Sequence, residues 1–174
     1  MMIFEVQDET GLVENANAYC DVECFRQYFR NINVDTNSFT DDEIKGAIVQ
    51  GTTYIDINYD FIGYKMADSE QTTEFPRFLR RKPNPAEAPI PREVEKANCE
   101  LGMFVLSGGE LFRSFEADER GVQFLDQKVA QIQERVRYAT TNTDESTTAL
   151  LSIVDKYLEK SGWIRIRKSV VERM

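Results

Sequence analysis

The sequence predicts a mainly α protein, a small helical bundle followed by an extended C-terminal tail. Several segments carry apolar residues at helical spacing between capping residues and stop signals. The stretch 82–91 contains four of the five prolines and is expected to form a stiff connector. The last residues alternate apolar and basic side chains, which is typical of a strand or a docking arm.

Two helices are expected in the first third of the chain. Asp21 can cap the first helix. Its apolar stripe contains Val22, Phe25 and Phe29. Thr40 and Glu43 form a capping box, in which each side chain accepts a hydrogen bond from the other residue's backbone N–H, so the second helix starts here. Gly46 and Gly51 lie within it, and such small residues suggest that another helix packs closely against this one.

Two more helices are expected further along the chain. Pro91 suits the first turn of one helix, which ends at the glycine pair 108–109. Its apolar stripe contains Val94, Ala97, Leu101, Phe104 and Val105. Asp144 or Ser146 can cap the last helix, which stops at Gly162.

The segment between these two helices fits two structures. One set of apolar residues has helical spacing: Leu125, Val129, Ile132 and Val136. Another set has the alternation of a strand: Ile132, Glu134, Val136 and Tyr138. The residues alone leave helix and strand open. The resulting organisation is a single domain with a helical core over 1–109, an insertion over 110–143, a helix over 144–162 and a basic tail over 163–174.

The cysteines and the absence of histidine argue against a metal site. Cys20, Cys24 and Cys99 make an odd count, so a disulfide framework is not expected. A zinc site needs about four ligands, usually cysteine together with histidine, and the chain has no histidine. The sequence predicts buried or half-buried free thiols and no cofactor.

The sequence also predicts that the protein is not an enzyme. Without histidine the chain lacks the commonest general base near neutral pH and the usual partner of a nucleophilic serine or cysteine. The sequence contains no nucleophile elbow, P-loop or dinucleotide-binding glycine motif.

The net charge of −9 argues against tight binding to nucleic acid, which is normally gripped by lysine and arginine. Two basic clusters lie at 77–82 and 165–173, and each fits either a docking patch or a solvated surface. We find no apolar run long enough to span a bilayer and no signal-peptide pattern, so we expect no membrane partner and folding in a cytoplasm.

Four ordered motifs carry a resemblance to a known family. They read G-L-V-E-N-A-N-A-Y over 11–19, Q-Y-F over 27–29, A-I-V-Q-G-T-T-Y-I-D-I-N-Y-D-F-I-G-Y-K over 47–65 and E-F-P-R over 74–77. With them the chain resembles a small phage family labelled DnaT-like single-stranded-DNA-binding protein. The resemblance favours a β-hairpin in the ambiguous segment, with extended stretches near Val122–Val129 and Ile132–Thr140. The family usually turns through Gly-Pro here, whereas this chain has Ala-Gln at 130–131.

Members of that family in virion gene clusters act as head–tail connector, or adaptor, subunits. The resemblance therefore implies a structural protein of the virion neck that is assembled in the host cytoplasm. It implies a homo-oligomeric ring of about twelve copies closed by head-to-tail contacts. The ring would bind the portal protein above and a tail or neck protein below, and double-stranded DNA would pass through it without specific binding.

Within that role, two sets of residues are candidates for contacts. The basic tail would dock on the portal or another partner through Trp163, Ile164, Arg165, Ile166, Arg167 and Lys168. Acidic side chains facing the lumen would repel phosphate and let DNA slide. The candidates are Glu116, Asp118, Glu119 and Asp126. The alternatives are a tail that packs on its own bundle and acidic residues that are simply solvated.

A single-stranded-DNA-binding module in phage replication is the alternative function. Such a module needs a basic groove with exposed aromatic side chains on which bases stack. Aromatic residues are present, namely Tyr54, Tyr59, Phe61, Tyr64 and Phe75. Most of them fall at core spacings and the overall charge is unfavourable, so the sequence favours the connector.

Overall fold

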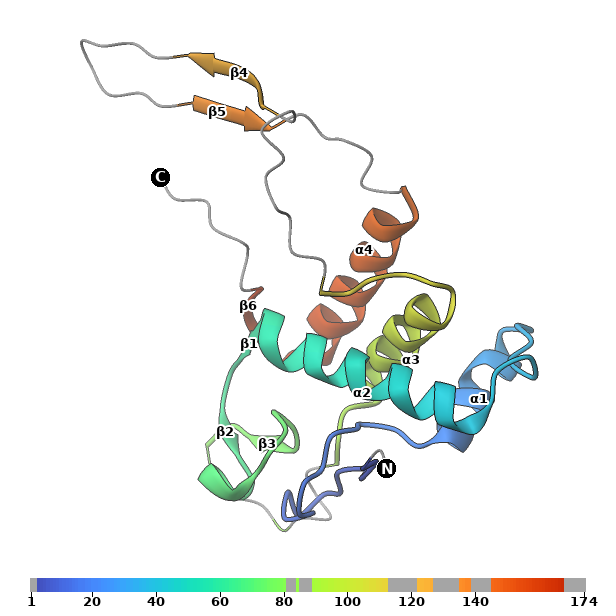
Figure 1. The fold of residues 1–174 in the computed structure, drawn as a ribbon. Helices are drawn as coiled ribbons and strands as arrows, with labels where there is room; N and C mark the ends of the chain where they lie inside the picture. Colours follow the sequence, from blue (N-terminus) through green and yellow to red (C-terminus); the bar gives the residue numbers. More distant parts are fainter. Residues whose placement is uncertain are drawn as a thin grey trace.

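The structure, a computed structural model, describes residues 3–80, 84, 89–112, 122–126, 135–138 and 145–167 (Figure 1). For 122–126, 135–138, 145–149 and 165–167 it describes the backbone only. The elements are α1 (Val22–Asn31), α2 (Asp41–Asn58), β1 (Tyr59–Phe61), β2 (Tyr64–Lys65), the 3₁₀ helix η1 (Asp68–Glu70), β3 (Arg77–Phe78), α3 (Arg92–Leu106), β4 (Val122–Asp126), β5 (Arg135–Tyr138), α4 (Glu145–Ser161) and β6 (Ile164–Arg167). The predicted mainly α fold with a short hairpin is confirmed.

The expected helix starts are confirmed at atomic detail. The Asp21 carboxylate accepts a hydrogen bond from the Cys24 backbone N–H at 2.7 Å and caps α1. At α2, the Thr40 N–H donates to Glu43 Oε2 at 2.8 Å, and the Glu43 N–H donates to Thr40 Oγ1 at 3.3 Å. These bonds satisfy backbone donors that have no partner within the helix.

Helices α2 and α3 pack closely, as the glycines in α2 predict. A Cβ at Gly51 would lie 3.1 Å from Leu101 Cβ and 2.9 Å from Asn98 Nδ2 of α3, so a side chain there would force the helices apart. Asn98 is fully buried and donates from Nδ2 to Ile48 O and to Thr52 Oγ1, both at 3.0 Å. These bonds satisfy a polar group in the core and tie the two helices together.

The apolar core has two parts on either side of the α2–α3 pair. The first part joins α2, β1, α3 and α4 and includes Tyr59, Phe75, Leu101 and Leu158. The second part joins α1 to α2 and α3 and is centred on Phe25 and Ile48. Because α4 supplies residues to the first part, the helix that follows the insertion completes the core.

The described residues form three two-stranded antiparallel sheets beside the helices: β1 with β6, β2 with β3, and β4 with β5. Strands β4 and β5 fall within the segment that the sequence left open, and their register pairs Val122 with Tyr138 and Asp126 with Arg135. Within the described residues these two strands pair only with each other. Figure 1 shows this hairpin standing away from the helices.

None of the helices in the described part of the chain combines the length and the apolar character that a bilayer-spanning segment requires.

Candidate functional site

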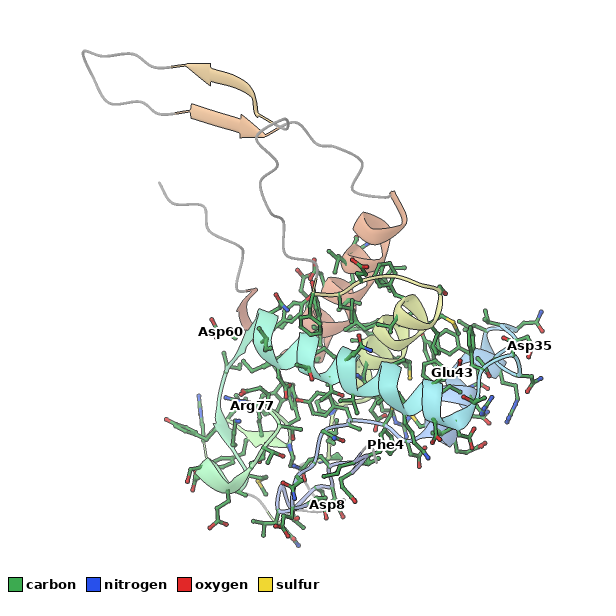
Figure 2. All side chains as sticks on the ribbon, viewed as in Figure 1. Phe4, Asp8, Asp35, Glu43, Asp60 and Arg77 are labelled. Carbon is green, nitrogen blue, oxygen red and sulfur yellow. The ribbon has the colours of Figure 1, made fainter. Side chains whose placement is uncertain are left out.

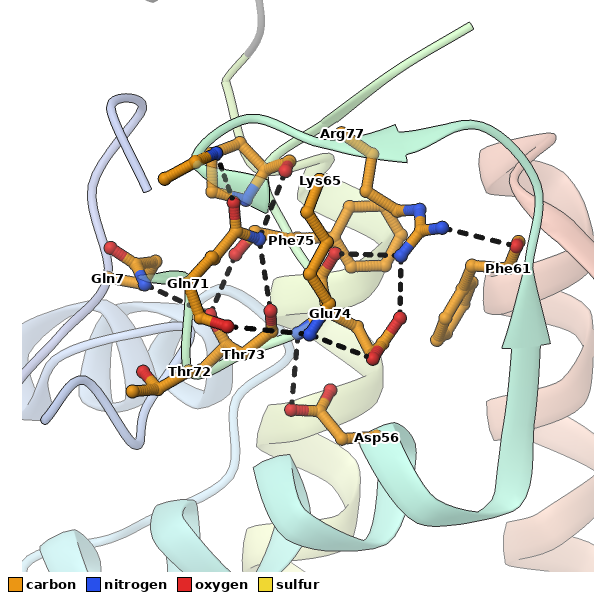
Figure 3. Close-up of polar contacts among 12 residues, drawn as sticks. Gln7, Asp56, Phe61, Lys65, Gln71, Thr72, Thr73, Glu74, Phe75 and Arg77 are labelled. Carbon is orange, nitrogen blue, oxygen red and sulfur yellow. Dashed lines mark hydrogen bonds and ion pairs between the residues drawn. The ribbon is translucent and has the colours of Figure 1, made fainter. Parts of the chain in front are cut away.

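Arg77 of the E-F-P-R motif holds the turn after β1 in place (Figure 3). Its guanidinium donates to three successive backbone carbonyl oxygens, at 3.3 Å for Phe61, 2.9 Å for Ile62 and 2.8 Å for Gly63. It also forms an ion pair with Glu74, with Nη1 and Oε2 2.6 Å apart, and its side chain is only 8% exposed. Arginine suits this place because its planar fork can satisfy several acceptors at once.

The other residues of the motif fill the space beneath α2. Phe75 is fully buried, and the peptide bond between Phe75 and Pro76 is cis. The Phe75 ring makes edge contacts with the rings of Tyr19, Phe61 and Trp163. Lys65 of the preceding Y-K motif pairs with the other oxygen of Glu74 at 3.1 Å. The two motifs thus form one network that links β1, β2 and β3.

Asp56 of α2 is a group in this network with strongly altered acidity. Its carboxylate accepts hydrogen bonds from the Tyr19 hydroxyl and from the Glu74 backbone N–H. Burial raises the pKa of Asp56 from 3.8 to about 7, although the Tyr19 hydrogen bond opposes the rise. Burial and the neighbouring Asp56 raise the pKa of Tyr19 well above its ordinary value. The arrangement joins Tyr19, α2 and the E-F-P-R turn in one hydrogen-bonded unit.

Asp56 is expected to make stability fall as the pH rises. Between about pH 4 and 7 the native state keeps a proton that the unfolded state has lost, so the free energy of unfolding decreases across this window. Asparagine does not ionise, so the free energy of unfolding of Asp56→Asn should not show this decrease. Relative to the wild type, the free energy of unfolding of the variant should therefore rise by about 2–4 kcal/mol between pH 4 and pH 8, at about 1.4 kcal/mol per pKa unit. Urea unfolding of both proteins at several pH values checks this, and a difference independent of pH would contradict it.

The predicted docking tail begins in the core of its own chain. The centroids of the Trp163 and Phe75 rings lie 6.1 Å apart. The backbone carbonyl of Trp163 accepts a hydrogen bond from the Ile62 N–H at 2.8 Å. Trp163 and Ile164 are half-buried against the first core. Residues Arg165, Ile166 and Arg167 continue as β6, in which Ile166 pairs with Asp60 and Arg167 with Tyr59 of β1. The alternation in the tail is therefore that of a strand, while Lys168 lies outside the described residues.

The four acidic residues predicted to face a lumen lie in or beside the hairpin. Glu116, Asp118 and Glu119 are outside the described residues. Asp126 is the last residue of β4, opposite Arg135 of β5. Their role stays a prediction.

Comparison with known proteins gives one match. The family described as "Putative DnaT-like ssDNA binding protein" matches residues 2–170. The chain belongs to this family. The comparisons with curated proteins and with solved structures found no match.

In this DnaT-like protein the four motifs have structural roles in the described part of the chain. Gly11 has a positive φ of 73°, and a Cβ there would lie only 2.4 Å from the Gln71 side chain. Gln71 in turn donates to the carbonyls of Thr73 and Pro76 at 3.0 and 3.1 Å. The N-terminal motif and the E-F-P-R turn therefore fit against each other through residues far apart in the sequence.

The three cysteines of this DnaT-like protein meet, which the sequence did not predict. Cys20 lies just before α1, Cys24 in its first turns and Cys99 in α3. The three Sγ atoms all lie within 4.8 Å of one another. The sequence carries no signal for this meeting, because Cys20 and Cys99 are 79 positions apart in the chain.

Proposed function

We propose that this protein is a structural head–tail connector subunit of a tailed phage, which forms a ring below the portal and joins capsid to tail. Two observations support the proposal: the chain belongs to the DnaT-like family, and the described residues do not form a surface suited to binding nucleic acid. It involves no catalytic step. The surfaces that matter are contacts with other copies of the chain, with the portal and with a tail-side protein.

The observation that carries the proposal is the burial of the aromatic residues. A single-stranded-DNA-binding surface needs aromatic rings that bases can reach. Of the five candidates, Tyr54, Tyr59, Phe61 and Phe75 are buried, with exposed fractions of 0–8%. Tyr64 is 62% exposed and remains available. One exposed ring among these five candidates does not make a stacking platform.

Two of the basic residues near Tyr64 are also engaged, whereas Arg80 is exposed. Lys65 and Arg77 both form ion pairs with Glu74, and Arg77 also donates hydrogen bonds to backbone carbonyls. The net charge is −9. Figure 2 shows the labelled acidic residues Asp8, Asp35, Glu43 and Asp60 spread over separate parts of the molecule. Such a surface repels phosphate, as the wall of a DNA conduit should.

The hairpin supports an assembly role. An isolated two-stranded hairpin is marginally stable in water. Here β4 and β5 pair only with each other among the described residues and stand away from the bundle (Figure 1). In a ring, neighbouring subunits would cover such a hairpin. In the sequence the hairpin lies between α3 and α4, and both of these helices pack in the core.

Single-stranded DNA binding in replication is the second candidate, because the family description names that activity. The two proposals differ in a direct measurement. Fluorescence anisotropy with a labelled oligothymidine should give a Kd weaker than roughly 10⁻⁴ M at physiological salt if the protein is a connector. Tighter, salt-dependent binding that Tyr64→Ala weakens by about tenfold or more would favour the DNA-binding module.

The connector proposal is tested in the phage that encodes the protein. Disruption of the gene should leave DNA replication intact and give heads that do not join tails. A copy supplied in trans should restore whole particles, and imaging of those particles should place the protein at the neck. Reduced DNA synthesis with normal joining of heads to tails would overturn the proposal.

A further inference from the structure

The cluster of Cys20, Cys24 and Cys99 brings together three segments of the chain. The Sγ atoms of Cys20 and Cys99 are 3.8 Å apart, and all three sulfur atoms lie within 4.8 Å of one another. Cys20 and Cys99 are 2% and 1% exposed, whereas Cys24 is half-buried. The cluster thus has two buried thiols and a third at the edge of the core.

These spacings fit three thiolates around one metal ion. With Zn–S bonds of about 2.3 Å, sulfur atoms lie about 3.8 Å apart in a tetrahedral site and about 4.0 Å apart in a trigonal one. The Cys20–Cys99 pair already has that separation at 3.8 Å. The Sγ atom of Cys24 lies within 4.8 Å of the other two sulfur atoms. To reach the separations of a zinc site it would have to move closer to them by at most about 1 Å, which rotation of the Cys24 side chain can supply.

The surroundings of Cys24 favour a thiolate. Cys24 lies in the first turn of α1, where the helix dipole favours negative charge. A metal-bound thiolate would gain from this position.

We propose that Cys20, Cys24 and Cys99 bind one Zn²⁺ ion through three thiolates, with water in the fourth position on the half-buried side. Binding forms three Zn–S bonds, and the thiol protons pass to the solvent. The lack of histidine in the sequence does not prevent this, because three thiolates and a water complete a zinc coordination shell. The proposal is independent of the connector role.

Zinc at this place would add metal bonds between segments that hydrogen bonds already connect, from the Cys20 thiol to Asn98 Oδ1 at 3.4 Å and from the Tyr28 hydroxyl to Glu100. It would bind the stretch before α1, α1 itself and α3 to a single atom. A ligand that binds only the folded state raises its melting temperature. At free Zn²⁺ about 100 times the Kd, the expected rise is roughly 5–10 °C for a domain of this size.

The test uses the full chain, purified metal-free under reducing conditions without oxygen. Native mass spectrometry after addition of Zn²⁺ should show one ion per chain. Competition with a chromogenic chelator should give a Kd below micromolar. Cd²⁺ in place of Zn²⁺ should produce the thiolate-to-metal charge-transfer band in the ultraviolet.

Two matched variants of α1 decide whether the thiols are the ligands. Cys24→Ser removes one ligand at a half-buried position and should weaken Zn²⁺ binding at least 100-fold while leaving the circular dichroism spectrum unchanged. Glu23→Gln removes a neighbouring exposed charge and should bind like the wild type. The proposal is overturned if wild-type binding is weaker than micromolar, if Cys24→Ser binds normally, or if Glu23→Gln loses binding equally.

Discussion

Replacing Arg77 with alanine is expected to lower the free energy of unfolding by about 3–5 kcal/mol, as is usual when one partner of a buried ion pair is removed. The change leaves the Phe61, Ile62 and Gly63 carbonyls without their donor. It also leaves Glu74 with Lys65 as its sole ion-pair partner among the described residues. Urea unfolding followed by circular dichroism measures the loss.

Two further variants test why arginine is needed at this position. Arg77→Lys keeps the charge but offers a single ammonium group, so it should recover less than half of the lost stability. Arg80→Ala removes an exposed arginine three residues later and should change stability by less than about 0.5 kcal/mol. If the Arg77 and Arg80 variants had equal effects, the network around the E-F-P-R turn would not be a source of stability.

Truncation after Gly162 is expected to have a comparable effect. It removes Trp163, which packs on Phe75, and the whole of β6, which pairs with β1. Loss of a fully buried aromatic side chain costs about 3–5 kcal/mol, and Trp163 is half-buried, so this range is an upper bound for its own share. A chain that ends after Arg167 keeps every described contact of the tail, so its stability should match the full chain within about 0.5 kcal/mol.

This pair of truncations separates folding from docking. The chain ending after Arg167 is expected to fold normally, and in the proposed role it lacks Lys168 of the docking set. Thermal unfolding of both chains, followed by pull-down on portal rings, measures the two properties separately. Full stability of the chain ending after Gly162 would show that β6 adds nothing to the subunit, and the tail would then be a free arm.

The helices could be predicted because their signals are local. Asp21, the Thr40–Glu43 capping box and the glycines at 108 and 162 each act within a few residues, and each delimits a helix as expected. The ambiguous segment was different, because its residues have both helical and strand spacing. The family resemblance favoured the hairpin, and β4 and β5 confirm it.

The contacts of the candidate sites could not be predicted, because they depend on pairs of residues far apart in the chain. Nothing near Cys99 indicates that it meets Cys20 and Cys24. The role of Arg77 could not be predicted either, because it donates to backbone carbonyls. Every residue has a backbone carbonyl, so the sequence does not indicate which ones Arg77 will contact. The basic tail was expected to be a strand or a docking arm, and the pairing of β6 with β1 depends on a tertiary contact between residues far apart in the chain.

The pairing of Tyr59 with Arg167 affects the order of events during synthesis. The Tyr59 hydroxyl also donates to Asp155 of α4 at 2.6 Å, so the first core needs residues that lie 96 positions apart in the chain. Contacts between such distant positions form late. A nascent polypeptide therefore cannot finish folding until α4 has left the ribosome, and chains terminated before α4 would not reach the native state.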